Sequence, residues 1–508
     1  MWEGRRASSA RGNADLDPVL RNTLRYTVSA REYAALHKYI LSRSKALRRA
    51  APTPANVDKA LQPRKGNDDY NARAVRHALR VFAVSWLGMK GWDAVARKVK
   101  DKEAAANSKK QPFYSSPALR MSLSLSAILL LYRWLFRFLT RLRTHLLQPE
   151  VEPFRLRNPR TAATLTSPYA PALGASFAGL ALGIYPRRQL RVTIAIYSLF
   201  RALEFGWNAC EAEGLIWGVK NGRRRERPWW FGSWMLQPVA FGQLFHAFVF
   251  DRDCLPEPSR NGSFILADIY IANSLSYQRE SSPTVTCEPR SFNIKSTSSH
   301  QPSLLRYLTS FRPVVSTDIS HILDQHVPTS TRVLLLFYSA MTVVPRFKSF
   351  YHSPLATINS ILASALRMST FATGALSSAW ASICFFQTYL PRHVLATQRY
   401  FLGGFFAGLW AWVERRHGRG VFLYSARVSV DSFWKVGVKR RWWKSMKSGD
   451  VWVFVLALMV TGVVYERDAR AIREGQWRKG VSWIRGQGWR DWSAEEDAEE
   501  AEDREKNL

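Results

Sequence analysis

The stretch Ala118-Leu119-Arg120-Met121-Ser122 returns letter for letter as Ala365-Leu366-Arg367-Met368-Ser369, and each copy is followed by the same landmarks in the same order. The first run continues with Phe177-Ala178-Gly179-Leu180, Tyr197-Ser198, Arg201 and Phe250-Asp251-Arg252-Asp253. The second run continues with Phe406-Ala407-Gly408-Leu409, Tyr424-Ser425, Arg427 and Tyr465-Glu466-Arg467-Asp468. An ordered series of five matches in apolar, glycine-containing segments indicates an internal duplication, which is how many polytopic membrane proteins are built.

The apolar runs of the chain can be compared with the roughly 20 residues that a helix needs to cross a bilayer. The clearest runs cover residues 121–140, 168–185, 190–207, 229–250, 371–390, 401–413, 421–434 and 451–465. The mean hydropathy of the whole chain is slightly negative because the polar residues are concentrated outside these runs. We therefore predict an all-α, polytopic integral membrane protein built from two tandem related helical repeats.

The polar stretches between the apolar runs predict the domain boundaries. We expect a basic N-terminal tail over 1–75, an amphipathic segment and polar run over 76–117, a first membrane repeat over 118–253, a Ser-, Pro- and Arg-rich linker over 254–330, a second membrane repeat over 331–470, and a Trp/Arg interfacial segment with an acidic tail over 471–508. Tryptophans interleaved with Arg and Lys, as in the last segment, are typical of a chain that lies on a membrane surface.

The chain of 508 residues is strongly basic, with a net charge of +34. The charge sits in short clusters beside apolar runs, such as Arg223-Arg224-Arg225 and Lys439-Arg440-Arg441. This placement is expected for the flanks of membrane spans that contact anionic lipid. No zinc-finger, RNA-recognition or helix-turn-helix pattern is present, so we expect no nucleic-acid partner. A basic soluble scaffold that binds nucleic acid is the alternative, and it would require the apolar runs to be core helices.

The sequence offers little sign of a cofactor or a metal. Its four cysteines are scattered, and no two of them stand at the spacing of a metal site or a disulfide framework. No P-loop, dinucleotide-binding fingerprint, nucleophile elbow or kinase signature is present. We therefore expect no metal, no cofactor and no catalytic residues.

Charges inside the apolar runs are the sharpest signal at the level of single residues. Arg201 and Glu204 are three positions apart, and Arg427 and Asp431 are four apart, so each pair can meet on one helix face. A charge in the membrane is costly, and it faces either a partner or a water-filled cavity. The two pairs could line a polar pathway between the repeats, but the interpretation that we favour is two structural ion pairs.

Glycines mark candidate positions for close helix packing. Gly179 and Gly183 are four residues apart, Gly174 lies near the same helix face, and Gly404 and Gly408 repeat the four-residue spacing. Small residues at this spacing allow two helix backbones to approach closely in lipid. We assign these five glycines a role in helix packing.

His246 and Asp251 form a His-x4-Asp pattern, the spacing at which glycerolipid acyltransferases place an Asp that activates a His as general base. The second run has Thr461 near the position of the His, and no accompanying glycine motif for substrate is present. A membrane-bound lipid-modifying enzyme of the acyltransferase kind is therefore the alternative function. A metal site that includes Asp253 and Cys254 is disfavoured because the donors would not converge from one helix end.

Three stretches resemble the transmembrane protein 135 family. They are Trp234 to Pro256 (WMLQPVAFGQLFHAFVFDRDCLP), Phe177 to Glu204, and Phe386 to Gly404, the last resembling the fungal members. Within the first stretch, Phe250, Asp251, Arg252 and Asp253 are the distinctive signature. The glycine helices are also similar to those of the superfamily of mitochondrial inner-membrane translocases and peroxisomal membrane proteins.

The resemblance implies a multi-pass membrane protein of peroxisomes or mitochondria that is associated with lipid handling or mitochondrial dynamics. The function that we favour is non-enzymatic: organisation of the organelle membrane, or transport of lipid or polypeptide. The resemblance implies no catalytic residues, and the expected partners are the lipid bilayer, organelle membrane proteins or a second copy of the chain. One feature departs from the family: animal members carry a cysteine-rich N-terminal region, whereas no Cys precedes Cys210 here.

Overall fold

The computed structural model describes residues 18–39, 41–43, 52–61, 69–99, 116–220, 223–225, 227–255, 354–391, 394–395, 397–496 and 498–499. The regular structure of the described part is helical apart from a short hairpin, whose strands β1 (Val219–Lys220) and β2 (Arg223–Arg224) have two residues each. The prediction of an all-α chain is therefore confirmed. Nearly all of the predicted linker 254–330 and the first part of the predicted second repeat, before residue 354, lie outside the described residues.

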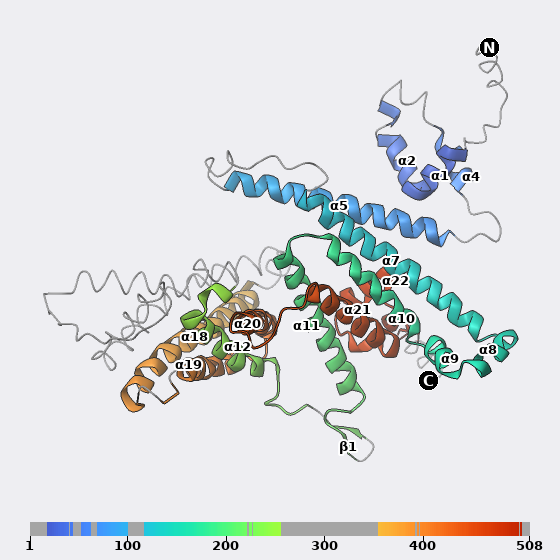
Figure 1. Cartoon of the computed structure of the whole chain (residues 1–508). Coiled ribbons are helices and arrows are strands. Elements are labelled where there is room, and N and C mark those ends of the chain that lie inside the picture. Colours follow the sequence, from blue (N-terminus) through green and yellow to red (C-terminus); the bar gives the residue numbers. More distant parts are fainter. Residues whose placement is uncertain are drawn as a thin grey trace, which may run out of the picture. The chain divides into compact units, whose positions relative to one another are not determined.

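The chain divides into two compact units (Figure 1). Unit 1 comprises residues 1–225 and 447–508, and unit 2 comprises residues 226–446. These units do not follow the predicted repeats. The last helix of the predicted first repeat lies in unit 2, and the last helix of the predicted second repeat lies in unit 1.

Unit 1 is an assembly of helices that includes both described ends of the chain. Its α-helices are α1 (Pro18–Thr27), α2 (Ala30–Tyr39), α4 (Pro54–Leu61), α5 (Tyr70–Val99), α7 (Pro117–Leu146), α8 (Glu152–Arg157), α9 (Pro159–Thr166), α10 (Ala170–Ala175), α11 (Arg188–Ala212), α21 (Gly449–Arg467) and α22 (Gly475–Arg485). Its 3-10 helices are η1 (Leu41–Arg43), η3 (Pro149–Val151), η4 (Ser176–Ile184) and η8 (Ala469–Ala471).

Helix α7 is the long central element of unit 1. It begins where the Ser116 hydroxyl accepts a hydrogen bond from the Leu119 N–H at 3.3 Å, with Pro117 as the first helical residue, a combination that favours helix initiation. Along its length α7 packs against α5, α10 and η4, while α21 packs against η4 and α11. One apolar cluster of this unit joins Phe205 of α11 to Val464 of α21 and to Ile472.

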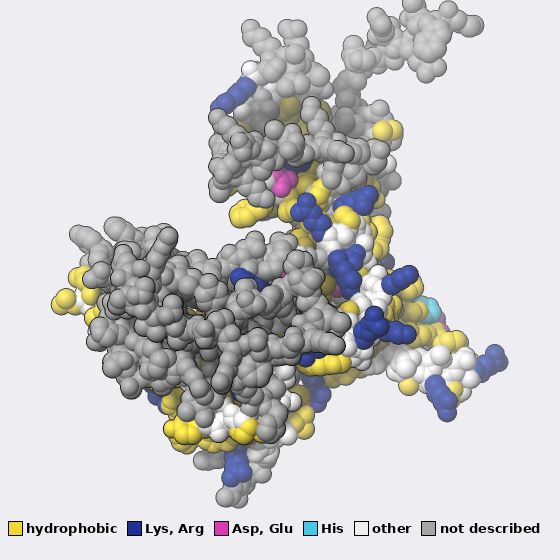
Figure 2. All heavy atoms as spheres, turned by 60° about the vertical axis from the view of Figure 1, so that its left-hand side comes forward, with side chains coloured by type: hydrophobic (Ala, Val, Ile, Leu, Met, Phe, Trp, Pro, Cys, Tyr) yellow, Lys and Arg dark blue, Asp and Glu magenta, His cyan; other side chains and the backbone are white. Residues whose placement is uncertain are grey.

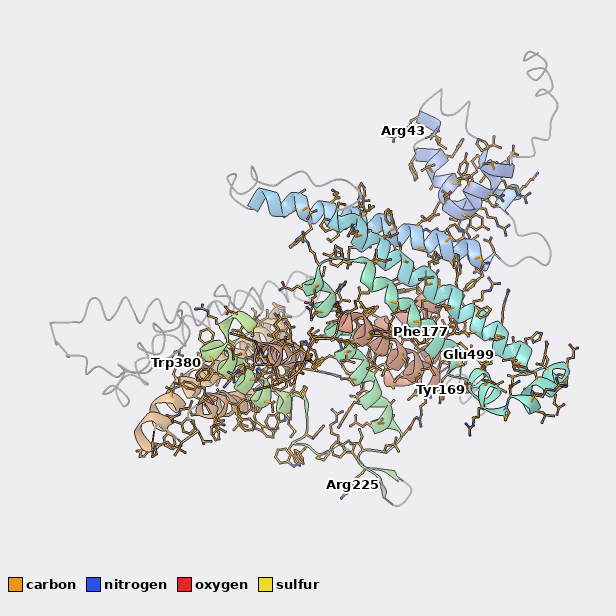
Figure 3. All side chains as sticks on the ribbon, viewed as in Figure 1. Arg43, Tyr169, Phe177, Arg225, Trp380 and Glu499 are labelled. Carbon is orange, nitrogen blue, oxygen red and sulfur yellow. The ribbon has the colours of Figure 1, made fainter. Side chains whose placement is uncertain are left out.

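Unit 2 is a smaller bundle. Its elements are η5 (Ser233–Met235), α12 (Leu236–Phe250), η6 (Arg252–Cys254), α18 (Pro354–Tyr389), α19 (Gln398–Gly408), η7 (Leu409–Trp412) and α20 (Arg419–Lys439). Helix α12 packs against both α19 and α20, and α18 packs against α19 and η7. Figure 3 shows the side chains of the described chain on the ribbon, with Phe177 of η4 and Trp380 of α18 among those labelled.

The two Phe-Ala-Gly-Leu motifs lie where an α-helix gives way to a 3-10 helix. The run 168–185 was predicted as one helix, but it is divided into α10 and the nine-residue 3-10 helix η4, which contains the first motif. In the second motif, Gly408 ends α19 and Leu409 begins η7.

Helices α19 and α12 touch through their backbones. A Cβ atom added to Gly404 would lie 2.5 Å from the Phe241 carbonyl oxygen, and one added to Gly408 would lie 2.4 Å from the Pro238 Cα. Gly242 of α12 approaches the carbonyl oxygen of Phe401 in the same way. No side chain other than hydrogen fits at such separations, so these glycines set the distance between the two helices.

Two helices of the described part, α7 and α21, are long and apolar enough to cross a membrane, and residues 170–184 form a shorter apolar stretch. Helix α21 extends the predicted run 451–465 to 19 residues. Helix α12 is shorter than the predicted run 229–250, because residues 233–235 form the separate 3-10 helix η5.

The contact between α19 and α12 predicts the effect of Gly404→Ala. The new methyl group would meet the Phe241 carbonyl, which belongs to a helix backbone and cannot rotate away, so we expect a loss of stability of about 1–3 kcal/mol. Thermal unfolding of the purified protein measures it. The control is Gly420→Ala, where nothing lies within 4 Å of the added atom and we expect a change within about 0.5 kcal/mol. Equal effects of the two variants would contradict the backbone contact.

Candidate functional site

Asp251 is a buried acidic group of unit 2 with two cationic partners. It follows the last residue of α12, and its buried carboxylate accepts from Arg440 Nη2 at 2.7 Å and pairs with Lys439 Nζ at 3.1 Å. Burial raises the pKa of Asp251, but the hydrogen bonds and positive charges of Lys439 and Arg440 outweigh burial and leave the pKa below its ordinary value. The carboxylate is therefore ionised and ties the end of α12 to the end of α20.

The rest of the Phe250 to Asp253 signature surrounds this ion pair. The Phe250 ring packs edge-on against Tyr400 with 5.2 Å between the ring centroids, and the Arg252 guanidinium lies over the Phe248 ring. Asp253 is exposed, 3.8 Å from Lys439. The signature residues thus join the ends of helices α12, α19 and α20 at one end of the bundle.

The acyltransferase alternative requires Asp251 to orient His246. Among the described residues no hydrogen bond joins these two side chains, because both carboxylate oxygens of Asp251 face Lys439 and Arg440. The His246 ring instead packs on Phe250 with 5.0 Å between centroids. The described part of the chain also contains no group of three His, Cys, Asp or Glu residues that could hold a metal ion. The geometry gives the alternative no support.

The structure brings Arg201 and Glu204 together on α11. Arg201 Nη1 lies 3.0 Å from Glu204 Oε2 and 3.3 Å from Glu474 Oε1 just before α22. The same guanidinium lies over the rings of Tyr197 and Trp477. Sequence spacing found the first partner but not Glu474 or Trp477, which come from a distant part of the chain. The cluster couples α11 to α22.

The second predicted pair has a different principal contact. Asp431 lies 2.6 Å from Lys435 Nζ, one helical turn further along α20. Arg427 donates from Nε to the Leu423 carbonyl at 3.1 Å, and its guanidinium lies over the Tyr424 ring. The pairing of Arg427 with Asp431 stays a prediction, and Lys435 is a partner that sequence reasoning missed although it has the same four-residue spacing.

The glycines of the first predicted repeat lie at contacts within unit 1. A Cβ atom on Gly179 would lie 3.1 Å from side-chain atoms of Phe454 and Val455 of α21, and one on Gly183 would lie 3.8 Å from Val451. One on Gly174 would meet Leu139 of α7. Gly179 and Gly183 therefore face α21, a helix of the predicted second repeat.

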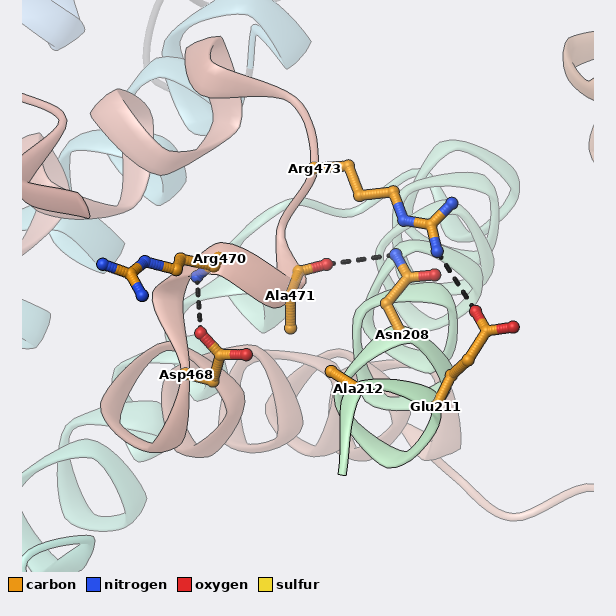
Figure 4. Close-up of a pocket in the computed structure, with 7 residues that line it drawn as sticks. All are labelled: Asn208, Glu211, Ala212, Asp468, Arg470, Ala471 and Arg473. Atoms are coloured by element: carbon orange, nitrogen blue, oxygen red, sulfur yellow. Dashed lines mark hydrogen bonds and ion pairs between the residues drawn. The ribbon is translucent and has the colours of Figure 1, made fainter. Parts of the chain in front are cut away.

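A hollow of about 420 Å³ lies beside the C-terminal end of α11 (Figure 4). Asn208 Nδ2 donates to the Ala471 carbonyl at 3.1 Å, and Arg473 Nη2 pairs with Glu211 Oε2 at 3.1 Å. The side chain of Arg470 extends away from this pair, while its N–H donates to the Asp468 carboxylate. Two arginines and two carboxylates line the hollow, so its charges are balanced and favour neither anions nor cations.

Arg133 is a charged group whose role the sequence did not reveal. It is buried in the middle of α7, and it donates from Nε to the Ile484 carbonyl at 3.2 Å and from Nη2 to the Trp483 carbonyl at 2.5 Å. These carbonyls belong to the last turn of α22, where the helix dipole is negative. Arg133 has no carboxylate partner among the described residues, so backbone dipoles compensate its charge.

His77 of α5 completes this junction. Its Nδ1 lies 2.6 Å from Arg133 Nη1, and its ring stacks on Trp483 with 5.7 Å between centroids. A guanidinium is only a donor, so Nδ1 accepts and the imidazole is neutral. Burial and the positive charge of Arg133, together with Arg73, Arg76 and Arg80, lower the pKa of His77 to about 4. A small cavity of about 110 Å³ lies beside the pair.

Comparisons with models of protein families, with curated proteins and with solved structures found no match.

The His77 junction predicts a loss of stability in mild acid. The unfolded imidazole takes up a proton below its ordinary pKa of 6.5, whereas the folded one does so only near 4. Folding stability is therefore full above pH 6.5 and declines as the pH falls toward 4. Because the ring is only partly buried, we expect a loss on the order of 1 kcal/mol.

This loss is measured by the free energy of unfolding of the wild type and of His77→Gln at about pH 7.5 and about pH 5. The exposed His145→Gln is the control, and an unchanged pH dependence in His77→Gln would contradict the assignment.

The Asp251 ion pairs predict a contrast between two neighbouring aspartates. Asp251→Asn leaves Lys439 and Arg440 without their buried anion, and we expect a loss of about 1–3 kcal/mol. Asp253→Asn is the matched control, because the Asp253 side chain is 83% exposed and that of Asp251 only 6%, and we expect a change within about 0.5 kcal/mol. Chemical unfolding measures both variants, and a larger loss in Asp253→Asn would exclude the assignment.

Proposed function

We propose that this protein is a multi-pass, non-enzymatic protein of an organelle membrane, peroxisomal or mitochondrial, that organises the membrane or moves lipid or polypeptide through it. The choice of organelle and role comes from the resemblance to the transmembrane protein 135 family. The placement in a bilayer is supported by the distribution of aromatic and basic residues over the helices of each unit.

The observation that carries the proposal is a pair of aromatic and basic belts at the two ends of unit 2. At one end, before α20 begins, the rings of Trp234 and Trp412 pack edge-on with 5.0 Å between centroids, and the Arg415 guanidinium lies 3.8 Å from the Trp412 ring. At the other end, Trp443 after α20 stacks on Trp434 of α20, and the Arg440 guanidinium lies over Trp442. Tryptophan and arginine together are typical of the bilayer interface.

Helix α20 runs from the first belt into the second, since Trp434 is one of its residues. It has 21 residues, which correspond to about 31 Å at 1.5 Å per residue, and the hydrocarbon core of a bilayer is about 30 Å thick. It also carries Arg427, Asp431 and Lys435, so within the described part α7 and α21 are the helices whose own composition suits a span. Between the belts, side chains such as Tyr424 and Val430 are exposed. A membrane would cover these apolar side chains while the belts lie in its two interfaces.

The two long apolar helices support the same placement. Only 28% of the most apolar window of α7 and 39% of that of α21 are buried within the protein, whereas the core helix of a soluble protein has its apolar surface covered. Large side chains such as Leu131 and Phe138 of α7 and Leu456 of α21 are exposed. Figure 2 shows such hydrophobic side chains at the surface, between lysines and arginines that suit contact with anionic lipid headgroups.

Alkaline carbonate extraction of the tagged full-length protein, from density-separated mitochondria and peroxisomes, tests the proposal. We expect the protein to stay in the membrane pellet, because carbonate removes proteins held by charge but not those held by apolar spans. The organelle fraction that retains it identifies the membrane. Release into the supernatant would contradict membrane insertion and would favour the basic soluble scaffold.

The His246→Ala variant separates the proposal from the acyltransferase alternative. We expect it to complement a deletion strain as well as wild type does, because the proposed role needs no general base. Loss of complementation by a variant that is still expressed and still retained in the pellet would favour the enzyme.

A further inference from the structure

The helices of unit 1 that carry the sequence landmarks pack in a defined order. Helix α7 meets η4, where Ser124 Oγ donates to the Ala181 carbonyl at 3.0 Å. Element η4 then meets α21 through Gly179, and α21 meets α11, where a Cβ atom on Gly206 would lie 3.8 Å from Val460. The order across the bundle is therefore α7, η4, α21 and α11.

Unit 2 has the same order. Helix α18 meets the segment formed by α19 and η7, where Trp410 Nε1 donates to Ser378 Oγ at 2.6 Å. That segment meets α12 through Gly404, and α12 meets α20, where Gln237 Nε2 donates to Ser425 Oγ at 3.1 Å. The order across this bundle is α18, α19 with η7, α12 and α20.

The sequence landmarks identify which helices correspond. The Ala-Leu-Arg-Met-Ser motif lies in α7 and in α18, the Phe-Ala-Gly-Leu motif in η4 and at the junction of α19 with η7, and the Tyr-Ser motif in α11 and in α20. The Phe250 to Asp253 and Tyr465 to Asp468 motifs mark α12 and α21 as corresponding fourth helices. Yet α21 lies in unit 1 with the first three helices of the first run, and α12 lies in unit 2 with those of the second.

We propose that the two units are copies of one four-helix bundle and that each copy is completed by the fourth helix of the other repeat. The inference rests on the internal duplication and is independent of whether the bundles lie in a membrane. The surface formed by η4 and α11 is then a docking surface for α21, and the surface formed by α19 and α20 is a docking surface for α12.

Charged contacts at the helix ends hold each fourth helix in its unit. In unit 1, Arg467 Nη2 at the end of α21 donates to Glu213 Oε2, just after α11, at 2.7 Å. In unit 2 the neighbouring position of the motif makes the contact, because Asp251 after α12, which aligns with Glu466, accepts from Arg440 after α20 at 2.7 Å.

The fourth helix also enters each unit in the same direction. Arg191 near the start of α11 bonds to Asp450 near the start of α21 at 2.7 Å, so these helices run parallel. Helices α20 and α12 also run parallel, because Gln237 meets Ser425 near their starts and Asp251 meets Arg440 at their ends. Near the starts of α20 and α12 the contact is instead between two uncharged side chains, Gln237 and Ser425. The charged pair of Arg191 and Asp450 therefore favours α21 over α12 as the fourth helix of unit 1.

Disulfide cross-linking in the full chain tests the exchange. In a variant whose native cysteines are replaced and whose segment 254–330 carries a protease site, we introduce Gly206→Cys with Val460→Cys. We expect oxidation to join the two fragments after cleavage, and the uncleaved protein to run as a monomer. The control is Leu203→Cys with Val460→Cys, because the Leu203 side chain is exposed, and we expect at least a tenfold lower yield of the cross-link.

A second pair examines the unexchanged arrangement. Phe245 of α12 corresponds to Val460 when the fourth-helix motifs are aligned. A cross-link between Gly206→Cys and Phe245→Cys, or the absence of one between Gly206→Cys and Val460→Cys, would overturn the proposal. A cross-linked dimer of the uncleaved Gly206→Cys, Val460→Cys protein would also overturn it, because the exchange would then take place between two chains. These outcomes do not depend on carbonate extraction, so failure of the exchange and failure of the proposed function are distinguishable.

Charge reversal tests the contact between α11 and α21 without cysteines. We expect Glu213→Arg to lower the melting temperature of the full chain because Arg467 would then face a like charge, and we expect Glu213→Arg with Arg467→Glu to recover most of that loss. Recovery shows that the two positions meet in the folded protein. A double variant no more stable than Glu213→Arg alone would contradict the contact.

Discussion

The direct contact between helix backbones at glycine is the constraint on which unit 2 depends. Because Gly404 and Gly408 present no side chain, α19 lies against the carbonyls and Cα atoms of α12. That contact fixes the position of α12, and α12 in turn provides the surface on which α20 packs. In a lipid environment, where apolar side chains gain little by leaving the solvent, such close van der Waals contact is a main source of helix association.

Charged groups on the apolar helices are compensated close to where they occur. Asp251 is held by two cations of α20 and its C-terminal cap, Arg201 by two carboxylates and two aromatic rings, and Arg133 by the carbonyls that end α22. An uncompensated charge would be expensive in either a protein interior or a bilayer. The contacts thus act as ties between helices, and they favour the structural interpretation of these charges over a polar pathway.

The ion pairs of the candidate site could be predicted from the sequence where both charged residues lie on one helix. Arg201 and Glu204 meet because residues three positions apart share a helix face, whatever the rest of the fold does. The same rule left Asp431 ambiguous, since Lys435 and Arg427 both stand four positions from it. The partners of Arg133 could not be predicted, because they are backbone carbonyls, and every residue has one. The two carbonyls also belong to Trp483 and Ile484, which are distant from Arg133 in the sequence.

The sequence by itself determined that the chain is helical, where most helices lie, and which glycines suit close packing, because apolar runs and small side chains act over a few residues. It also pointed to the two runs of matching landmarks. Only the tertiary structure decided which helices share a bundle and that residues 168–185 divide into α10 and η4. An apolar helix face fits many others, so the choice of α21 for unit 1 and of α12 for unit 2 rests on contacts between residues far apart in the chain, such as Arg467 with Glu213 and Asp251 with Arg440.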